Sequence, residues 1–323
     1  MILNEKLIKT YSSIGSRATF GLVALELVKE NKKLMVLTAD VSTSAGLDRF
    51  RKTYPDNFVE IGIAEQNLIG VASGLSSEGF NVFTTTFSPF QTLRCCEQIK
   101  VNLGYMKEKV VMVGLASGLV LGSLGFTHCS IEDIGVLRSI PNITILSPAD
   151  CGETAKCVYA AANHHESVYI RLTGGSNNPP IYNSDYKFEI GKAIKLRDGE
   201  DVTIYATGNM VHKALNVASI LNDQKISASV INVHTIKPID VDIINEESKK
   251  TKLFLSIEEH NIIGGLSSSI SEVMSKTVGS PKLISYGVND YYEKGGDHSY
   301  LQKNYGLDEA NIVLEVSNEL KNI

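Results

Sequence analysis

The chain has 323 residues, of which 43% are hydrophobic and 21% are charged, and its formal net charge is −5. These values are typical of a soluble globular protein with about two domains. The acidic balance argues against a nucleic-acid binder, because such proteins need dense Lys and Arg clusters to neutralise phosphates.

Cysteine use and hydropathy indicate a cytoplasmic protein. The five cysteines form no CxxC pair, and we recognise no signal peptide, so we expect free thiols in a reducing compartment. Residues 110–126 are apolar and uncharged, but four glycines and two serines interrupt them. This pattern favours a buried strand followed by a Gly-rich loop over a membrane span.

In the first half of the chain, short apolar runs alternate with amphipathic stretches. The runs that predict buried strands are 33–40 (KLMVLTAD), 81–87 (NVFTTTF), 109–115 (KVVMVGL), 143–150 (ITILSPAD) and 167–173 (SVYIRLT). Apolar residues at helical spacing follow within 64–75 and 151–164. Strands that alternate with helices predict a parallel sheet covered on both faces.

The pattern breaks at residues 176–191, where paired prolines and polar residues predict a linker. The alternation then resumes, with strands expected at 201–208, 227–240, 252–260 and 281–287 and a helix at 210–224. We therefore predict an α/β protein of two domains, each a mostly parallel sheet wrapped by helices. The predicted boundaries are 1–178, a linker at 179–192, and 193–323.

In such sheets ligands bind at the carboxyl ends of the strands. The residues there that attract attention are Asp40, Glu65, Phe87, His128 and Arg171. The chain contains no GxGxxG after a strand and no GxxxxGK[ST]. Because no His, Cys or Asp cluster has metal-ligand spacing, we predict no metal ligand on this chain.

Four segments in a fixed order carry a family resemblance, and a fifth extends it. They are LTADVSTSAGLDRF (37–50), FVEIGIAEQNLIGVASGLSSEGF (58–80), TTTFSPFQTLRCCEQIK (84–100), THCSIEDIGVLRSIPNITILSPAD (127–150) and SIEEHNIIGGLSSSISEVM (256–274). The chain resembles the C-terminal half of transketolase, a pyrimidine-binding domain followed by the final domain. The likeness is greatest to split transketolases, in which two genes encode the two halves.

The resemblance assigns Glu65 to the acid that hydrogen-bonds N1′ of the aminopyrimidine ring of thiamine diphosphate. A carboxylate there favours the imino tautomer that activates the cofactor, while the cofactor supplies the electron sink. The alternative interpretation of Glu65, which needs no resemblance, is a solvated acid at a helix N-terminus. By the same likeness Phe87 and Phe90 stack on the pyrimidine, and Asp40 and Val41 contact the cofactor.

Arg94, one helical turn beyond Phe90, is open to two interpretations: it orients this region or it pairs with Glu97. Arg17, Ser44 and Arg171 match the residues that grip the sugar phosphate in the family, a task suited to the forked guanidinium. Taken singly, each arginine is better explained by a surface salt bridge.

His128 matches a histidine beside the reactive carbon, where an imidazole shuttles protons; alternatively it caps the helix that follows. The sequence departs from the family in the loop before it. Two residues that touch donor hydroxyls in the family, a histidine and an aspartate, are replaced by Ala116 and Leu124. A pocket without these groups can no longer hydrogen-bond those hydroxyls, an interaction that contributes strongly to discrimination, so we expect a deoxy ketose donor or an unusual acceptor.

The family's GDG motif for the diphosphate and Mg²⁺ does not occur in this chain. We therefore expect a partner, the N-terminal transketolase subunit, to hold the diphosphate and Mg²⁺ (or Ca²⁺) in an α2β2 assembly that includes a homodimer contact between copies of this chain.

The predicted activity is that of a transketolase-type transferase that is active only with this partner. It moves a two-carbon ketol unit from a ketose to an aldehyde in a carbohydrate-tailoring pathway. The ketose is expected to be phosphorylated if the assignment of Arg17, Ser44 and Arg171 is correct. One alternative is pyruvate decarboxylation, as in deoxyxylulose-phosphate synthase or a 2-oxoacid dehydrogenase β subunit. The other is a non-catalytic scaffold.

Overall fold

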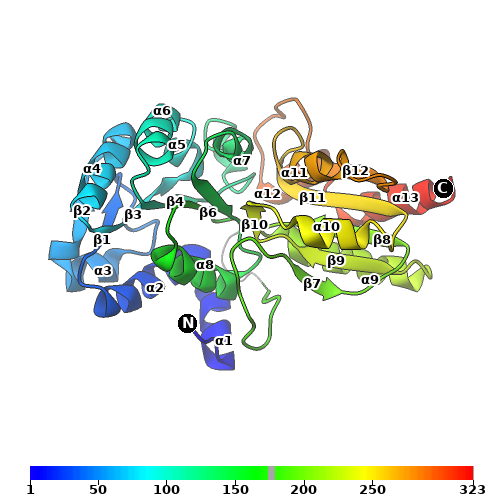
Figure 1. The fold of residues 1–323 in the computed structure, drawn as a ribbon, viewed down its shortest axis with the longest axis horizontal. Helices are drawn as coiled ribbons and strands as arrows, with labels where there is room; N and C mark the ends of the chain where they lie inside the picture. Colours follow the sequence, from blue (N-terminus) through cyan, green and yellow to red (C-terminus); the bar gives the residue numbers. More distant parts are fainter. Residues whose placement is uncertain (174–178, 323) are drawn as a thin grey trace.

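The computed structural model describes residues 1–173 and 179–322, which form two sheets covered by helices (Figure 1). The first part of the chain contains α1 (Glu5–Ile14), α2 (Ser16–Glu30), β1 (Leu34–Thr38), α3 (Asp48–Thr53), β2 (Phe58–Glu60), α4 (Glu65–Ser77), β3 (Asn81–Phe87), α5 (Ser88–Gln91), α6 (Cys96–Gln98), a π-helical segment (Ile99–Tyr105), β4 (Val110–Leu115), α7 (Asp133–Arg138), β5 (Ile143–Leu146), α8 (Cys151–Asn163) and β6 (Ser167–Arg171).

The second part contains β7 (Ile194–Arg197), β8 (Val202–Ala206), α9 (Met210–Asp223), β9 (Ala228–Asn232), β10 (Thr235–Lys237), α10 (Val241–Glu247), β11 (Leu253–Asn261), α11 (Leu266–Met274), β12 (Lys282–Val288), α12 (His298–Asn304) and α13 (Glu309–Leu320). No helix among the described residues is both long and apolar enough to cross a membrane.

The predicted α/β architecture is confirmed. The first sheet has the order β10-β5-β6-β4-β3-β1-β2, and all of its strands are parallel except β10. The second sheet has the order β12-β11-β8-β9-β7, and only β7 is antiparallel. The central parallel strands are buried along almost their whole length because helices cover both faces of each sheet.

The sequence pattern misjudged one segment and missed two strands, β2 and β7. Residues 227–240, predicted as one strand, form β9 in the second sheet and β10 at the edge of the first, where Thr235 pairs with Leu146 (Figure 1). A strand from the second half of the chain thus completes the first sheet. The boundary at 178 and the start of the predicted linker region, 176–178, fall outside the described residues; residues 179–193 contain no helix or strand.

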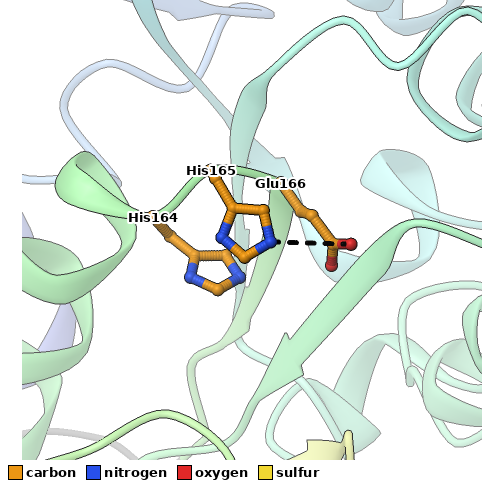
Figure 2. Close-up of side chains that lie close together, drawn as sticks. All are labelled: His164, His165 and Glu166. Carbon is orange, nitrogen blue, oxygen red and sulfur yellow. Dashed lines mark ion pairs between the residues drawn. The ribbon is translucent and has the colours of Figure 1, made fainter.

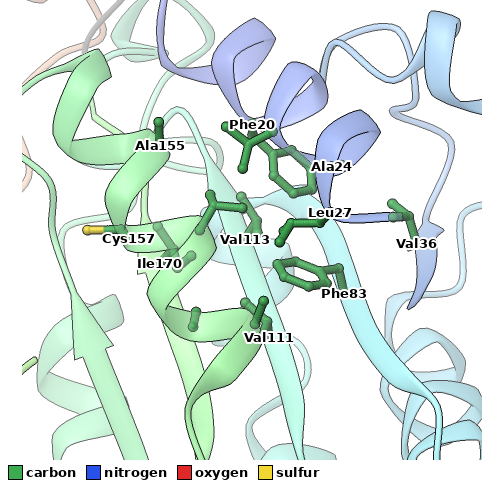
Figure 3. Close-up of a cluster of buried hydrophobic side chains, with 14 of the residues drawn as sticks. Phe20, Ala24, Leu27, Val36, Phe83, Val111, Val113, Ala155, Cys157 and Ile170 are labelled. Atoms are coloured by element: carbon green, nitrogen blue, oxygen red, sulfur yellow. The ribbon is translucent and has the colours of Figure 1, made fainter. Parts of the chain in front are cut away.

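The core of the first sheet lies on both of its faces. Figure 3 shows one face, where Phe20, Ala24 and Leu27 of α2 lie against Phe83 of β3 and Val111 and Val113 of β4. On the other face, residues of α4 and the π-helical segment belong to an apolar cluster that extends to Tyr205, Ile231 and Phe254 of the second part of the chain. Because one apolar cluster spans both sheets, burial of apolar surface holds the two parts together.

Buried polar residues add to this junction. Asp150 begins α8 as its N-cap, accepting the Glu153 N–H at 2.7 Å, and its other oxygen accepts the Ile181 N–H at 2.7 Å. Glu153 in turn accepts hydrogen bonds from Asn232 of β9 and from Tyr186. Burial raises the pKa of Asp150 to about 6. The segment after the undescribed residues is therefore bonded to the start of α8.

Candidate functional site

The parallel strands β1, β3, β4 and β6 are neighbours, so the residues that follow them gather at one edge of the first sheet. Asp40 follows β1, Phe87 ends β3, Ala116 follows β4 and Arg171 ends β6. Asp40 and Ala116 both have positive φ, +56° and +53°. These strained backbones turn the chain sharply at the strand ends, as is common at functional sites.

Glu65 is the first residue of α4, and its side chain is only 5% exposed. Arg94 donates from Nη1 to Glu65 Oε1 at 2.6 Å, and the Arg94 side chain is 42% exposed. Of the two interpretations of Arg94, the structure therefore supports one that orients the region through Glu65. The positive end of the α4 dipole also favours a carboxylate at this position.

The Phe90 ring connects this ion pair to two further rings, those of Phe87 and His128. The guanidinium carbon of Arg94 lies 3.9 Å from the Phe90 ring centroid. Phe87 meets Phe90 at 6.3 Å and 85°, and the His128 ring meets Phe90 at 5.3 Å and 70°. His128 is half-buried, and its Nδ1 lies 3.0 Å from Thr127 Oγ1. The structure thus brings Glu65, Phe87, Phe90 and His128 together, as the sequence predicted, and adds Arg94.

Asp40 is joined to the loop before Glu65 through Glu60, a residue that sequence reasoning missed, while the Val41 N–H donates to Thr38 Oγ1 in the same turn at 3.4 Å. Glu60 Oε1 accepts the Asp40 N–H at 2.7 Å and the Gly62 N–H at 3.1 Å. One carboxylate therefore fixes both the turn after β1 and the loop that leads to Glu65. The sequence contains no clear indication of this role, because Glu60 is distinguished from other acids at strand ends only by these two hydrogen bonds, which the folded structure shows.

Arg17 and Ser44 lie on segments that pack closely. Gly46 has a φ of +72°, and a Cβ added there would be 2.7 Å from the Ala18 Cα and 3.1 Å from the Arg17 carbonyl oxygen. Only glycine therefore lets this loop approach the start of α2. Arg17 and Ser44 are both half-buried, and Arg17 forms no ion pair within residues 1–173 and 179–322. Their role in phosphate binding stays a prediction.

Arg171 requires a correction. Its side chain is 1% exposed, and Nε donates to Asp133 Oδ2 at 2.8 Å. Nη2 donates to the carbonyl oxygens of Ser130 at 3.0 Å and Glu259 at 2.9 Å. Burial lowers the pKa of Arg171, but Asp133, together with Tyr169 and Glu259, raises it overall. Arg171 therefore joins the two parts of the chain, and its geometry does not suit a phosphate ligand.

The loop that carries His128 is held by the second part of the chain. Glu259, which is fully buried in β11, accepts the Leu119 N–H at 2.8 Å, His298 Nε2 at 2.7 Å and Gln302 Nε2 at 2.7 Å. Burial alone would raise the pKa of Glu259, but the charge of His298 and these hydrogen bonds lower it to about 2. Glu259 thereby fixes the start of the loop, which no sequence motif had indicated.

A small cluster that the spacing rules did not predict lies at the opposite end of β6. His164, His165 and Glu166 follow one another between α8 and β6, and one ligand atom from each lies within 4.8 Å of the others (Figure 2). His164 Nε2 is 3.2 Å from Thr144 Oγ1, and His165, which is 80% exposed, is 3.9 Å from Glu166. The set has metal-ligand chemistry, but it is remote from Glu65 and its most exposed member is weakly held.

Comparison with known proteins identifies both parts of the chain. Residues 12–178 match the transketolase pyrimidine-binding domain, and residues 191–312 match the transketolase C-terminal domain. A putative transketolase C-terminal section from Methanocaldococcus jannaschii is 38% identical over 310 residues, which are 95% of this chain and 96% of that protein. One subunit of the apulose-4-phosphate transketolase from Phocaeicola vulgatus is 36% identical over 93% of this chain and 95% of its own length.

The structural comparison agrees. The solved structure of a split gene transketolase, described as an inactive beta4 tetramer, superposes with a TM-score of 0.86 at 37% identity and covers 96% of this chain and 99% of that one. 1-Deoxy-D-xylulose-5-phosphate synthase from Caldanaerobacter subterraneus is 33% identical over 91% of this chain but only 47% of its own length. The chain belongs to the transketolase family and corresponds to its C-terminal half.

Proposed function

We propose that this chain is one subunit of a heteromeric, thiamine-diphosphate-dependent transketolase that transfers a two-carbon ketol unit from a ketose to an aldehyde. The observation that carries the proposal is the buried carboxylate of Glu65 at the start of α4, beside the ring of Phe90. A buried acid next to an aromatic face is the pair of groups that an aminopyrimidine requires.

The residues present fit the pyrimidine half of the cofactor. Glu65 would hold a proton at N1′, and Phe87 and Phe90 would pack against the ring. When bound, thiamine diphosphate supplies the electron sink for making and breaking carbon–carbon bonds. Asp40 and Val41 would border the cofactor at the end of β1, and His128, whose ring contacts Phe90, would move a proton to or from the substrate oxygen.

The relatives support a two-chain enzyme. The matched region is 95% of the apulose-4-phosphate transketolase subunit but about half of the longer synthase. We therefore propose that an N-terminal subunit supplies the diphosphate and Mg²⁺ (or Ca²⁺) contacts in an α2β2 assembly, with a homodimer contact between copies of this chain. The purified chain alone should bind thiamine diphosphate weakly, and calorimetry that found micromolar binding without a partner would contradict this arrangement.

The loop between β4 and His128 supports an unusual sugar. Ala116 and Leu124 offer no hydrogen-bonding side chain, and Leu124 is 57% exposed. Relatives in two tailoring reactions, apulose-4-phosphate transketolase and the 6-deoxy-6-sulfo-D-fructose transketolase of a Clostridium species (35% identical over 92% of this chain), are consistent with such a substrate. We propose a ketose donor of this modified kind, phosphorylated or otherwise anionic, held by Arg17 and Ser44.

A second candidate is decarboxylation of pyruvate, which the 33% identity to the synthase favours. The deciding experiment is to co-express the chain with its partner subunit and to assay ketose phosphates and pyruvate as donors with one aldehyde acceptor. Ketol transfer from a ketose without release of CO₂ is the expected result. Release of CO₂ from pyruvate would establish the second candidate, and inactivity of the assembled pair with every donor would support a scaffold role.

A further inference from the structure

Arg94 lies in the turn between α5 and α6, and its side chain uses both groups that the proposed cofactor site offers to a flat ring. Nη1 donates to Glu65 Oε1 at 2.6 Å, and the guanidinium carbon lies 3.9 Å from the centroid of Phe90. The side chain is therefore both an ion-pair partner of the buried acid and a cation over the aromatic face.

A guanidinium resembles an aminopyrimidine in the features that these groups recognise. Both are flat and delocalised, and both can share a proton with a carboxylate in their own plane. Arginine also makes directional, charged hydrogen bonds to carboxylates and stacks on aromatic rings, which lysine does not match. Since Glu65 Oε1 and this face of Phe90 are already engaged by Arg94, a pyrimidine that used them would have to displace the guanidinium.

We propose that Arg94 occupies the pyrimidine position of this subunit as an internal substitute, and that the cofactor binds by displacing it. The inference rests on the proposed function, because it assumes that Glu65 and Phe90 receive the aminopyrimidine. Arg94 thus lowers the apparent affinity for the cofactor: if the substituted state holds about 90% of the molecules, the apparent Kd is about tenfold above the intrinsic one.

The surroundings of Arg94 allow this exchange by side-chain movement alone. The side chain is 42% exposed, whereas Glu65 is 5% exposed and stays in place. The backbone is anchored, because Arg94 O accepts Gln66 Nε2 at 3.1 Å and Arg94 N–H donates to Pro89 O at 3.3 Å. Arg94 also stabilises the cofactor-free protein. A buried carboxylate without a partner is strongly destabilising, and Arg94 is the partner of Glu65 until N1′ of the cofactor takes its place.

The test measures thiamine diphosphate binding to the co-expressed pair by calorimetry, in the presence of Mg²⁺. Arg94→Gln should lower the Kd about tenfold and at the same time lower the melting temperature of the cofactor-free pair. Arg51→Gln is the matched control, because Arg51 pairs with Asp48 where both side chains are 44% exposed, and it should change neither quantity. Arg94→Lys keeps the charge but not the fork and should fall between parent and Arg94→Gln.

The direction in which the Kd for thiamine diphosphate changes in Arg94→Gln decides whether the proposal holds. An unchanged or higher Kd in Arg94→Gln would overturn the proposal, since Arg94 would then be neutral or a cofactor ligand. Absence of binding in both the parent pair and the variants would instead remove the proposed function, and the proposal with it.

A second measurement needs only the isolated chain. The nitrogen-15 spectrum of its arginine side chains should show one restrained guanidinium that disappears in Arg94→Gln and becomes mobile in Glu65→Gln. A freely rotating Arg94 in the parent chain would refute the internal substitution even if Arg94→Gln could not be produced.

Discussion

Replacing Arg171 with methionine should destabilise the protein strongly without changing its preference for a phosphorylated substrate. The structure gives three reasons for the first effect. Asp133, which is 0% exposed, loses its counter-charge, and the carbonyl groups of Ser130 and Glu259 each lose the hydrogen bond from Arg171 Nη2. The Tyr169 hydroxyl remains as a partner of Asp133 at 2.7 Å, so the carboxylate keeps one hydrogen bond but no cation from Arg171.

Removing one partner of a buried ion pair costs about 3–5 kcal/mol, a large part of the roughly 5–15 kcal/mol by which a protein is stable. An unfolding entropy of about 2.1 cal/mol/K per residue converts this cost, for a chain of this length, into a fall of about 4–7 °C in the melting temperature. The exposed pair of Arg51 and Asp48 gives the comparison, because Arg51→Met should cost less than about 1 kcal/mol.

The assay is a thermal melt of the two variants and the parent, followed by KM measurements on the assembled enzyme with a phosphorylated substrate and its unphosphorylated analogue. Arg171→Met should melt well below Arg51→Met, and its KM ratio for the two substrates should equal that of the parent. A melting temperature like the parent's, together with a KM raised only for the phosphorylated substrate, would refute the structural role and restore the phosphate role of Arg171.

Three further changes test other parts of the site. Arg17→Ala should raise KM for a phosphorylated substrate by the equivalent of roughly 1.5–3 kcal/mol, the usual contribution of a charged hydrogen bond; an equal rise for the unphosphorylated analogue would remove the assignment. Gly46→Ala places a Cβ 2.7 Å from the Ala18 Cα at a φ of +72°, so the melting temperature should fall and the KM effects of Arg17→Ala should be reproduced; unchanged kinetics would show that the loop does not position Ser44. For His298, burial lowers the pKa, but the charge of Glu259 and its hydrogen bond together raise it above 6.5. The stabilisation is therefore complete below pH 6.5 and is lost as pH rises through the folded-state pKa. The melting temperatures of parent and His298→Gln should converge as pH rises through that folded-state pKa, and a constant difference would contradict the pairing.

The fold was largely predictable because most of its parallel strands are short buried runs rich in apolar and β-branched residues. β1, β3, β4, β5 and β6 all lie within segments predicted from composition alone. β2 was missed because it has three residues that are not fully buried, a pattern too short to separate from a loop. β10 was misplaced because nothing local shows that a strand after Asn232 leaves its own sheet to pair with β5.

The site residues, like the strands, were predictable only in part. Glu65, Phe87, Phe90 and His128 lie on segments with specific motifs, and they meet in space. Arg171 was misassigned because its partners, Asp133 and Glu259, are far away in the sequence, and only the folded chain shows that its side chain points into the junction. The contact between Arg94 and Glu65 was likewise hidden, since the two residues are 29 positions apart.

The most direct test of the account concerns Glu65. Glutamine is nearly isosteric with glutamate and can still hydrogen-bond N1′, but it cannot hold the proton there as an acid does. In the assembled pair, Glu65→Gln should keep its fold and partner while proton–deuterium exchange at C2 of the bound cofactor, followed by NMR, slows by on the order of 10²-fold or more. Exchange as fast in Glu65→Gln as in the parent would show that this buried acid is only structural.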